Sequence, residues 1–333
     1  LKHLPFVRKD HARVRADIYP IRLWTVAVFI FGVLPLARSR GIGRIAIGNE
    51  FDSSSRLSHS GITHYGAVYD QSRWFDDALT RYFQRKTWNL VQFSILRPLS
   101  ELLIEKVLTE RYPGLQRLQM SCHATHVDGD DVSPCGKCEK CRRIVSMLTA
   151  LDADASQCGY TDAQIESCLR ALTEKGVHQE RDAAEQVLHM LINKGRVVQA
   201  TPVRPHPEVL GLRFDRERSP HEAVPADLRR PLYQILLEHA GGAVERLGRG
   251  WIETDPLSPE ALAVPHAFDR PHADEDWPGA DHVRLGPLTQ PQAERRFAEV
   301  DVALLPVGAI EQHGPHLPLD TDAWDAERLS LIH

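Results

Sequence analysis

The sequence predicts an α/β protein built from more than one domain. Three observations support this prediction: an apolar, helix-like stretch at 23–36, a short apolar run of strand type at 44–48 that is followed by a polar loop, and helical patterning over 161–195. The 333 residues are enough for two or three domains of roughly 100–150 residues each.

Composition and charge narrow the functional classes. The formal net charge of −5 argues against a general nucleic-acid binder, which usually carries a basic excess. The most apolar stretch, 23–36, is shorter than the ~20 residues that a membrane helix needs, and Pro35 interrupts it. We therefore expect a buried helix, no membrane partner and, because no signal peptide is found and the cysteines are clustered, a cytoplasmic location.

Residues 1–150 carry the clearest α/β pattern. The helix at 23–36 is followed by a basic end and Gly41, a helix-stop signal, and then by the buried strand. The polar loop after that strand contains Asn49 and Glu50, and α/β folds place ligands at such positions. A plain strand-ending turn explains the loop equally well. Residues 94–108 are apolar on one face and are predicted to be helical.

Residues 151–252 are predicted to be mainly helical. Thr161 can cap a helix, with Gln164 at the capping-box position. Residues 207–252 mix helix and short strand in a fold that the pattern does not define. Arg213, Arg216 and Arg218 alternate with acids there, which indicates a solvated face.

Residues 253–288 hold many prolines and acids, a composition typical of an extended linker. His266, His272 and His282 are expected to be solvated within it. A new domain is then predicted over 289–333. It begins with a helix capped by Thr289, and a buried strand follows at 302–307.

Four of the six cysteines form a cluster. They are Cys122, Cys135, Cys138 and Cys141. Thiolates spaced two residues apart can turn toward a single ion, and four such ligands favour zinc, although an iron–sulfur cluster uses the same set. Free or disulfide-paired thiols are the alternative, which the compact spacing disfavours. A four-thiolate site is closed, so we expect a structural role.

The other residues near this cluster are expected to be ordinary. His123 and His126 could replace Cys122 as a ligand, but a surface loop is the preferred interpretation. Cys158 and Cys168 show no partner spacing and are expected to be packed or free.

Ser121-Cys122, followed by Pro-Cys-Gly-Lys-Cys-Glu-Lys-Cys at 134–141 and two arginines, resembles the zinc segment of 7-cyano-7-deazaguanine synthases. These enzymes belong to the PP-loop ATP pyrophosphatase superfamily. The resemblance covers about 20–150 and implies ATP as a cofactor. The family's N-terminal serine–glycine–glycine loop is not found in this sequence, so either it lies upstream of Leu1 or the domain does not use ATP.

A second motif combines acids and histidines. Glu311 and His313 are two residues apart, so on an extended segment their side chains face the same way and can bind one divalent ion or two adjacent ions. Glycine and prolines then bend the chain, which can return Asp322 to the same place as a bridging carboxylate. A polar loop with chance acids and histidines is the alternative.

The run 305–322, Leu-Pro-Val-Gly-Ala-Ile-Glu-Gln-His-Gly-Pro-His-Leu-Pro-Leu-Asp-Thr-Asp, resembles the signature of the creatininase family, and a looser likeness extends over about 285–333. The resemblance implies a dinuclear centre of zinc or manganese that hydrolyses a cyclic amide or formamide. It implies that Glu311 and His313 each bind one metal and that Asp322 bridges them. A small-molecule amide is then the substrate, and a homo-oligomer can form through this domain.

The family's remaining ligands, a histidine and a glutamate, lie well downstream of this motif, and eleven residues follow Asp322 here. The chain is therefore expected to be an inactive fragment of its parent protein. That parent is predicted to fuse a zinc-bearing PP-loop-like domain to a creatininase-type amidohydrolase, in modified-nucleotide or cofactor metabolism. Two alternatives stay open: a non-catalytic zinc-binding protein with a relic motif, and a hydrolase whose N-terminal region is a regulatory appendage.

Overall fold

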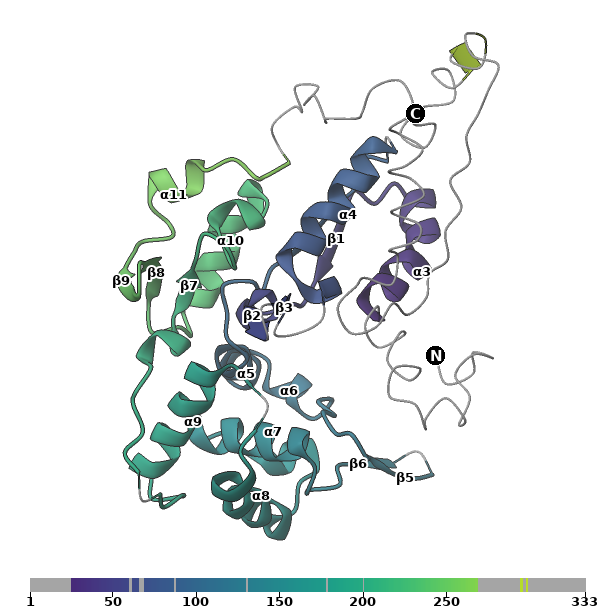
Figure 1. Cartoon of the computed structure of the whole chain (residues 1–333). Helices are drawn as coiled ribbons and strands as arrows, with labels where there is room; N and C mark the ends of the chain where they lie inside the picture. The colour runs from purple at the N-terminus through teal and green to yellow at the C-terminus, as the bar shows by residue number, and fades with distance from the viewer. Residues whose placement is uncertain are drawn as a thin grey trace.

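The computed structural model of the chain describes residues 25–268, apart from 60–61, 66–68, 87, 130, 178 and 200, together with 294, 295 and 298 (Figure 1). The described part mixes helices with small sheets, which confirms the predicted α/β class. None of its helices is both long and apolar enough to cross a membrane. The predicted helix from Thr289 and the strand at 302–307 fall outside the described residues, except for 294, 295 and 298.

A small parallel sheet organises the N-terminal part. Strand β1 (Arg44–Ile47) pairs with β4 (Val91–Ser94) in parallel, with Ile47 opposite Ser94. Between them the chain forms η2 (Phe51–Ser54), the hairpin of β2 (Arg56–His59) and β3 (Ile62–Tyr65), η3 (Tyr69–Gln71) and α4 (Arg73–Arg85). Figure 1 shows α4 beside β1 and α3 (Thr25–Ser39). The strand predicted at 44–48 is confirmed.

Helix α3 is buried on one face only, so the expectation of a buried helix is corrected. Ala27, Ile30 and Leu34 are spaced at helical intervals and are packed against the N-terminal core. The opposite face is also apolar but exposed, with Phe29 59% and Leu36 58% accessible. An all-apolar composition therefore did not mean burial on every side.

The helix predicted over 94–108 begins later than expected. Ser94 ends β4, and α5 runs over Glu101–Arg111 because Ser100 caps it, with its Oγ accepting from the amide of Leu103 at 3.0 Å. The remaining elements are α6 (Pro113–Gln116), β5 (His126–Asp128), β6 (Asp131–Ser133), α7 (Glu139–Ala150), η4 (Ala155–Cys158), α8 (Asp162–Lys175), α9 (Arg181–Asn193), η5 (Pro207–Leu210), β7 (Leu212–Phe214), η6 (His221–Ala223), α10 (Ala226–Leu237), β8 (Ala243–Leu247), β9 (Gly250–Glu253) and α11 (Pro259–Ala263).

The main hydrophobic core surrounds α7, which packs against α5, α8 and α9. Val145, Met147 and Leu148 are completely buried in it. Helix α8 begins with the predicted capping box, in which the Thr161 hydroxyl accepts from the Gln164 amide and the Gln164 side chain accepts from the Thr161 amide. The helices predicted over 161–195 are thus confirmed as α8 and α9.

Residues 207–252 combine helix α10 with a three-stranded sheet in the order β7-β8-β9. Strand β7 is buried along its whole length, so its polar residue cannot face solvent. Arg213 is completely buried and forms a bidentate pair with Glu180 at 2.8 and 2.6 Å, which corrects the predicted solvated face at that position. Arg216 is exposed, as predicted.

His266 is likewise buried rather than solvated. It is 3% exposed, and its ring lies 6.5 Å from that of Phe93, measured between centroids. Phe93 belongs to β4, so the segment after α11 returns to the N-terminal sheet. His272 and His282 lie outside the described residues.

Candidate metal centre

The structure brings the four clustered cysteines together. Their sulfurs lie within 4.8 Å of one another, and the closest separations are 3.4 Å for Cys138–Cys141, 3.8 Å for Cys135–Cys141 and 3.9 Å for Cys122–Cys138. Four sulfurs at the zinc–thiolate bond length form a tetrahedron with edges of about 3.8 Å. The donor set and its spacing therefore fit a single tetrahedrally coordinated ion, and none of the six cysteines forms a disulfide.

Local backbone structure positions these sulfurs. The hairpin of β5 and β6 separates Cys122 from Cys135, and Figure 1 shows it extending away from the helices. Cys138 is the N-cap of α7, and its sulfur accepts from the amide of Cys141 at 3.4 Å. The amide of Cys135 donates to the Cys122 sulfur at 3.3 Å. Amide donors of this kind stabilise thiolate charge, so the loop is suited to a cation.

Helix α8 contacts the metal loop, residues 134–138, which carries Cys135 and Cys138. Gly136 has a φ of +66°, in the left-handed region, and an added Cβ there would lie 2.3 Å from Cγ of Gln164. The Gln164 amide group donates to the carbonyl of Pro134 at 3.2 Å, and the Cys168 thiol donates to the carbonyl of Gly136 at 3.2 Å. Cys168 is thus buried and free, as predicted, and it supports the loop that carries Cys135 and Cys138.

The protonation of the thiols varies within the cluster. Burial acts to raise the pKa of Cys135, but the backbone amides of Lys137 and Cys138 donate to its sulfur and bring the net pKa down to about 7. Burial raises the pKa of Cys141 to about 12, and Cys141 is completely enclosed by the main core. A bound cation would supply the charge that a thiolate requires at this enclosed position.

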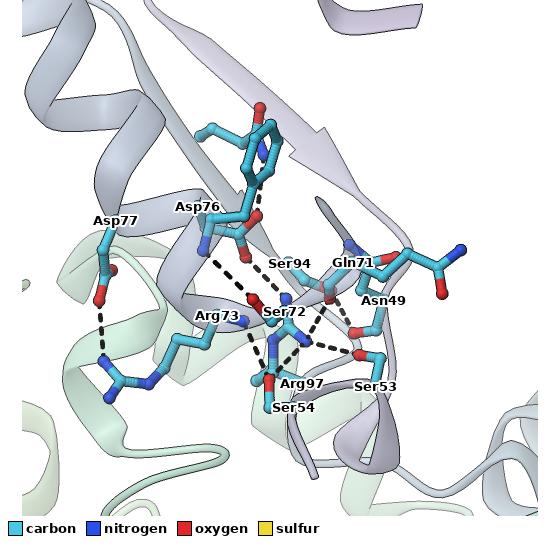
Figure 2. Close-up of polar contacts among 12 residues, drawn as sticks. Asn49, Ser53, Ser54, Gln71, Ser72, Arg73, Asp76, Asp77, Ser94 and Arg97 are labelled. Carbon is cyan, nitrogen blue, oxygen red and sulfur yellow. Dashed lines mark hydrogen bonds and ion pairs between the residues drawn. The ribbon is translucent and has the colours of Figure 1, made fainter. Parts of the chain in front are cut away.

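A second polar region lies where β1 and β4 end. The hydroxyl of Ser94 donates to the carbonyl of Asn49 at 2.7 Å and joins the two carboxyl ends (Figure 2). Arg97, 1% exposed, lies beneath the loop after β1 and donates to the hydroxyls of Ser53 at 2.7 Å and Ser54 at 3.1 Å. The polar loop predicted at this strand end is therefore confirmed as an ordered, buried structure.

Arg97 also joins this loop to α4. Its Nη2 donates to Asp76 at 2.7 Å, and the other carboxylate oxygen of Asp76 accepts from Gln92 at 2.8 Å. Burial raises the pKa of Asp76 to about 6, while the Arg97 guanidinium opposes the rise. The sequence carries no signal for this pair, because 21 residues separate Asp76 from Arg97 and no spacing pattern links them.

Two carboxyl groups follow Asn49 and are held close together. Burial raises the pKa of Glu50 to about 8, and the neighbouring Asp52 raises it further. Burial also raises the pKa of Asp52, and its hydrogen bond to Glu50 opposes that rise. The raised pKa favours the protonated form of Glu50 near neutral pH.

The other predicted site residues are placed as follows. His123 and His126 are exposed, as expected for a surface loop, and Cys158 is buried and free. Glu311, His313 and Asp322 lie outside the described residues.

A group that the sequence did not reveal consists of Asp182, His206 and Glu208, whose ligand atoms also converge within 4.8 Å. Asp182 lies in α9, whereas His206 and Glu208 lie at the start of η5. Glu208 is the one potential ligand close to His206 in the sequence, so spacing alone does not reveal the group.

Comparison with known proteins bears on the C-terminal segment. The family model for creatininase, described as creatinine amidohydrolase, matches residues 287–331. This match supports the creatininase resemblance of that segment and suggests an amidohydrolase-type domain there. No curated protein and no solved structure matches the chain. The resemblance to PP-loop enzymes stays a prediction.

Proposed function

We propose that residues 287–331 contribute to a metal-dependent amidohydrolase of creatininase type. The observation that carries this proposal is the creatininase match, which contains the Glu-x-His pair and the aspartate within one continuous segment. Carboxylate oxygens and an imidazole nitrogen suit zinc and manganese. Glu311 and His313 would each hold one of two ions, and Asp322 would bridge them. The ions would polarise the amide carbonyl of a cyclic amide or formamide and lower the pKa of bound water.

We also propose that the ion held by the four cysteines is zinc and that its role is structural. The tetrahedral spacing of the sulfurs supports zinc, and the enclosure of Cys141 supports a site without an open coordination position. The ion would join the segment before α7 to the core formed by α5, α7, α8 and α9.

We further propose that the N-terminal part binds ATP. The parallel pair of β1 and β4 with the polar loop at its carboxyl edge supports it, because α/β proteins bind nucleotides at such edges. Calorimetric titration of the full chain with ATP and Mg²⁺ measures this directly. Absence of binding heat at millimolar ATP would leave the edge with a structural role only.

Hydrolysis by the product of the complete reading frame, loaded with Mn²⁺ or Zn²⁺, tests the amidohydrolase proposal. A panel of cyclic amides and N-formyl amides would serve as substrates. We expect turnover of at least one class. Glu311→Gln and His313→Gln should each lower kcat/KM by more than about 10–100-fold, the loss that follows when only the hydrogen-bond partner of a metal ligand is altered. His316→Gln, in the same segment but outside the proposed ligand set, should retain most activity.

Absence of turnover across the panel, with metal bound and the protein folded, would contradict this function. The alternative is then a non-catalytic zinc-binding protein, for which the closed four-cysteine centre is the favourable observation.

A further inference from the structure

His206 lies at the centre of a group of acidic side chains between α9 and η5. Its Nδ1 is 3.0 Å from Oε1 of Glu208 and 3.9 Å from Oδ1 of Asp182. Its Nε2 is 3.0 Å from Oε2 of Glu185. His206 is 6% exposed, and a carboxylate lies 3.0 Å from each of its ring nitrogens. One ring nitrogen therefore faces two carboxylates, and the other nitrogen has its own carboxylate partner.

The charges around His206 favour a divalent cation, rather than a proton, beside Nδ1, the ring nitrogen that faces two carboxylates. Asp182, Glu185 and Glu208 carry three negative charges, and Arg181, which donates to Glu185 at 2.8 Å, offsets one of them. An imidazolium would offset one more. A divalent ion beside neutral His206 would offset both remaining charges, and its positive charge would lie directly between Nδ1 and the two carboxylates.

The distances are compatible with coordination. With bonds of 2.0–2.2 Å to nitrogen and oxygen, two ligand atoms of one ion lie about 2.9–3.4 Å apart. The pair of His206 and Glu208 already meets that range at 3.0 Å. Asp182 must move by about half an ångström, and its side chain, 41% exposed in the first turn of α9, has room to do so.

The surroundings of the imidazole are those of a metal ligand. A ligating histidine usually donates its second ring N–H to a carboxylate, which fixes the tautomer and the ring orientation. Glu185 accepts at Nε2 in this way and is itself held by Arg181. The backbone amide of His206 donates to the side chain of Gln186 at 2.7 Å, so α9 fixes the histidine at its backbone as well as at its ring.

We propose that Asp182, His206 and Glu208 bind a divalent transition-metal ion such as Zn²⁺ through one nitrogen and two carboxylate oxygens. Glu185 acts as a positioning residue. Three protein ligands leave a coordination position that a water molecule can fill, unlike the closed cysteine centre. The ion ties the start of α9 to η5, which leads into the sheet of β7, β8 and β9.

Zinc stoichiometry of the full chain tests this site. Glu311→Gln and His313→Gln are introduced first, so that the creatininase-type motif does not contribute ions. After equilibration with excess Zn²⁺ and gel filtration, we expect two ions per chain by elemental analysis. His206→Gln should reduce the count to one. His189→Gln, on α9 with Asp182 but outside the group, should leave the count at two.

A competition titration with a chromophoric chelator measures the strength of the second site. Glu185→Gln should weaken the second ion by about 10–100-fold, as expected when the partner of a ligating histidine is altered. Glu208→Gln retains a hydrogen-bond acceptor and guards against a folding defect in the histidine variant. Its circular dichroism should match that of the parent while its zinc count falls to one.

Two results would overturn the proposal. The first is a single bound ion in the chain with the two motif substitutions, lost on Cys141→Ala, which would mean that His206 is a protonated residue in an ion-pair network. The second is retention of both ions by folded His206→Gln and Glu208→Gln proteins.

Discussion

The cysteine centre and the Arg97 network are both buried polar structures, but they are built in opposite ways. Three of the four cysteines lie within seven residues, and the turn around Gly136 and the start of α7 bring them together. Arg97 instead links residues from η2, η3 and α4 to the segment after β4. The first arrangement is mostly local, and we propose that a bound ion stabilises it. The second is long-range and is stabilised by the protein's own charges.

The largest expected effect separates these two kinds of stability. Cys141→Ala removes a ligand at a fully buried position, and structural zinc in zinc-finger peptides contributes about 10–16 kcal/mol at pH 7. We expect loss of the ion and collapse of the packing among α7, α8 and α9, measured by circular dichroism and thermal unfolding. Cys158→Ala, also buried but outside the cluster, should cost only about 1 kcal/mol. Equal losses in the two variants would contradict a metal-dependent core.

The next effect concerns the Arg97 network. Arg97→Met leaves Asp76 buried without its cation, which should destabilise the protein by about 3–5 kcal/mol in urea unfolding. The double variant Arg97→Met, Asp76→Leu removes both charges and should recover part of that loss. Metal content should stay unchanged in both variants. A loss of the cysteine-bound ion in either variant would show that the two regions depend on each other, contrary to the view that each is stabilised separately.

The difference between the regions also shows what the sequence can predict. The cysteine cluster, the strand at 44–48 and the capping box at Thr161 all depend on residues a few positions apart, and the structure has each of these features. The ion pairs of Arg97 with Asp76 and of Arg213 with Glu180 depend on contacts formed only after folding. The alternation of arginines with acids predicts a solvated face for Arg213, but the burial of every residue of β7 overrides that pattern.

A smaller effect tests how α8 supports the metal loop. Gly136→Ala should lower the free energy of unfolding by about 1–2 kcal/mol, because alanine disfavours the left-handed backbone at this position. The added Cβ would also lie 2.3 Å from Cγ of Gln164, so that side chain must move. Gly129→Ala has a similar φ of +60° with nothing within 4 Å, so it should show the backbone cost alone. Thermal unfolding of the zinc-loaded proteins compares them. The idea fails if Gly129→Ala is as destabilising as Gly136→Ala.

The last effect depends on pH and on the loop after β1. Because burial raises the folded-state pKa of Glu50 to about 8, the native protein loses stability as pH rises from about 4.5 toward 8. Glu50→Gln mimics the protonated form and avoids that loss. The variant should be close to the parent at pH 5 and more stable at pH 9 by more than about 1.4 kcal/mol, the equivalent of one pKa unit. Urea unfolding at both pH values measures the free energy of unfolding of the variant and of the parent. If the variant differs from the parent by the same amount at pH 5 and at pH 9, Glu50 is not protonated in the native protein.

Cobalt substitution tests the proposed four-thiolate centre most directly. Co²⁺ bound by four thiolates in a tetrahedron gives intense visible bands and a sulfur-to-metal charge-transfer band. We predict both bands in the full chain, their loss in Cys141→Ala, and their retention in His206→Gln and in the Glu311→Gln, His313→Gln chain. A spectrum without the charge-transfer band in the folded protein would contradict the centre on which the described core is built.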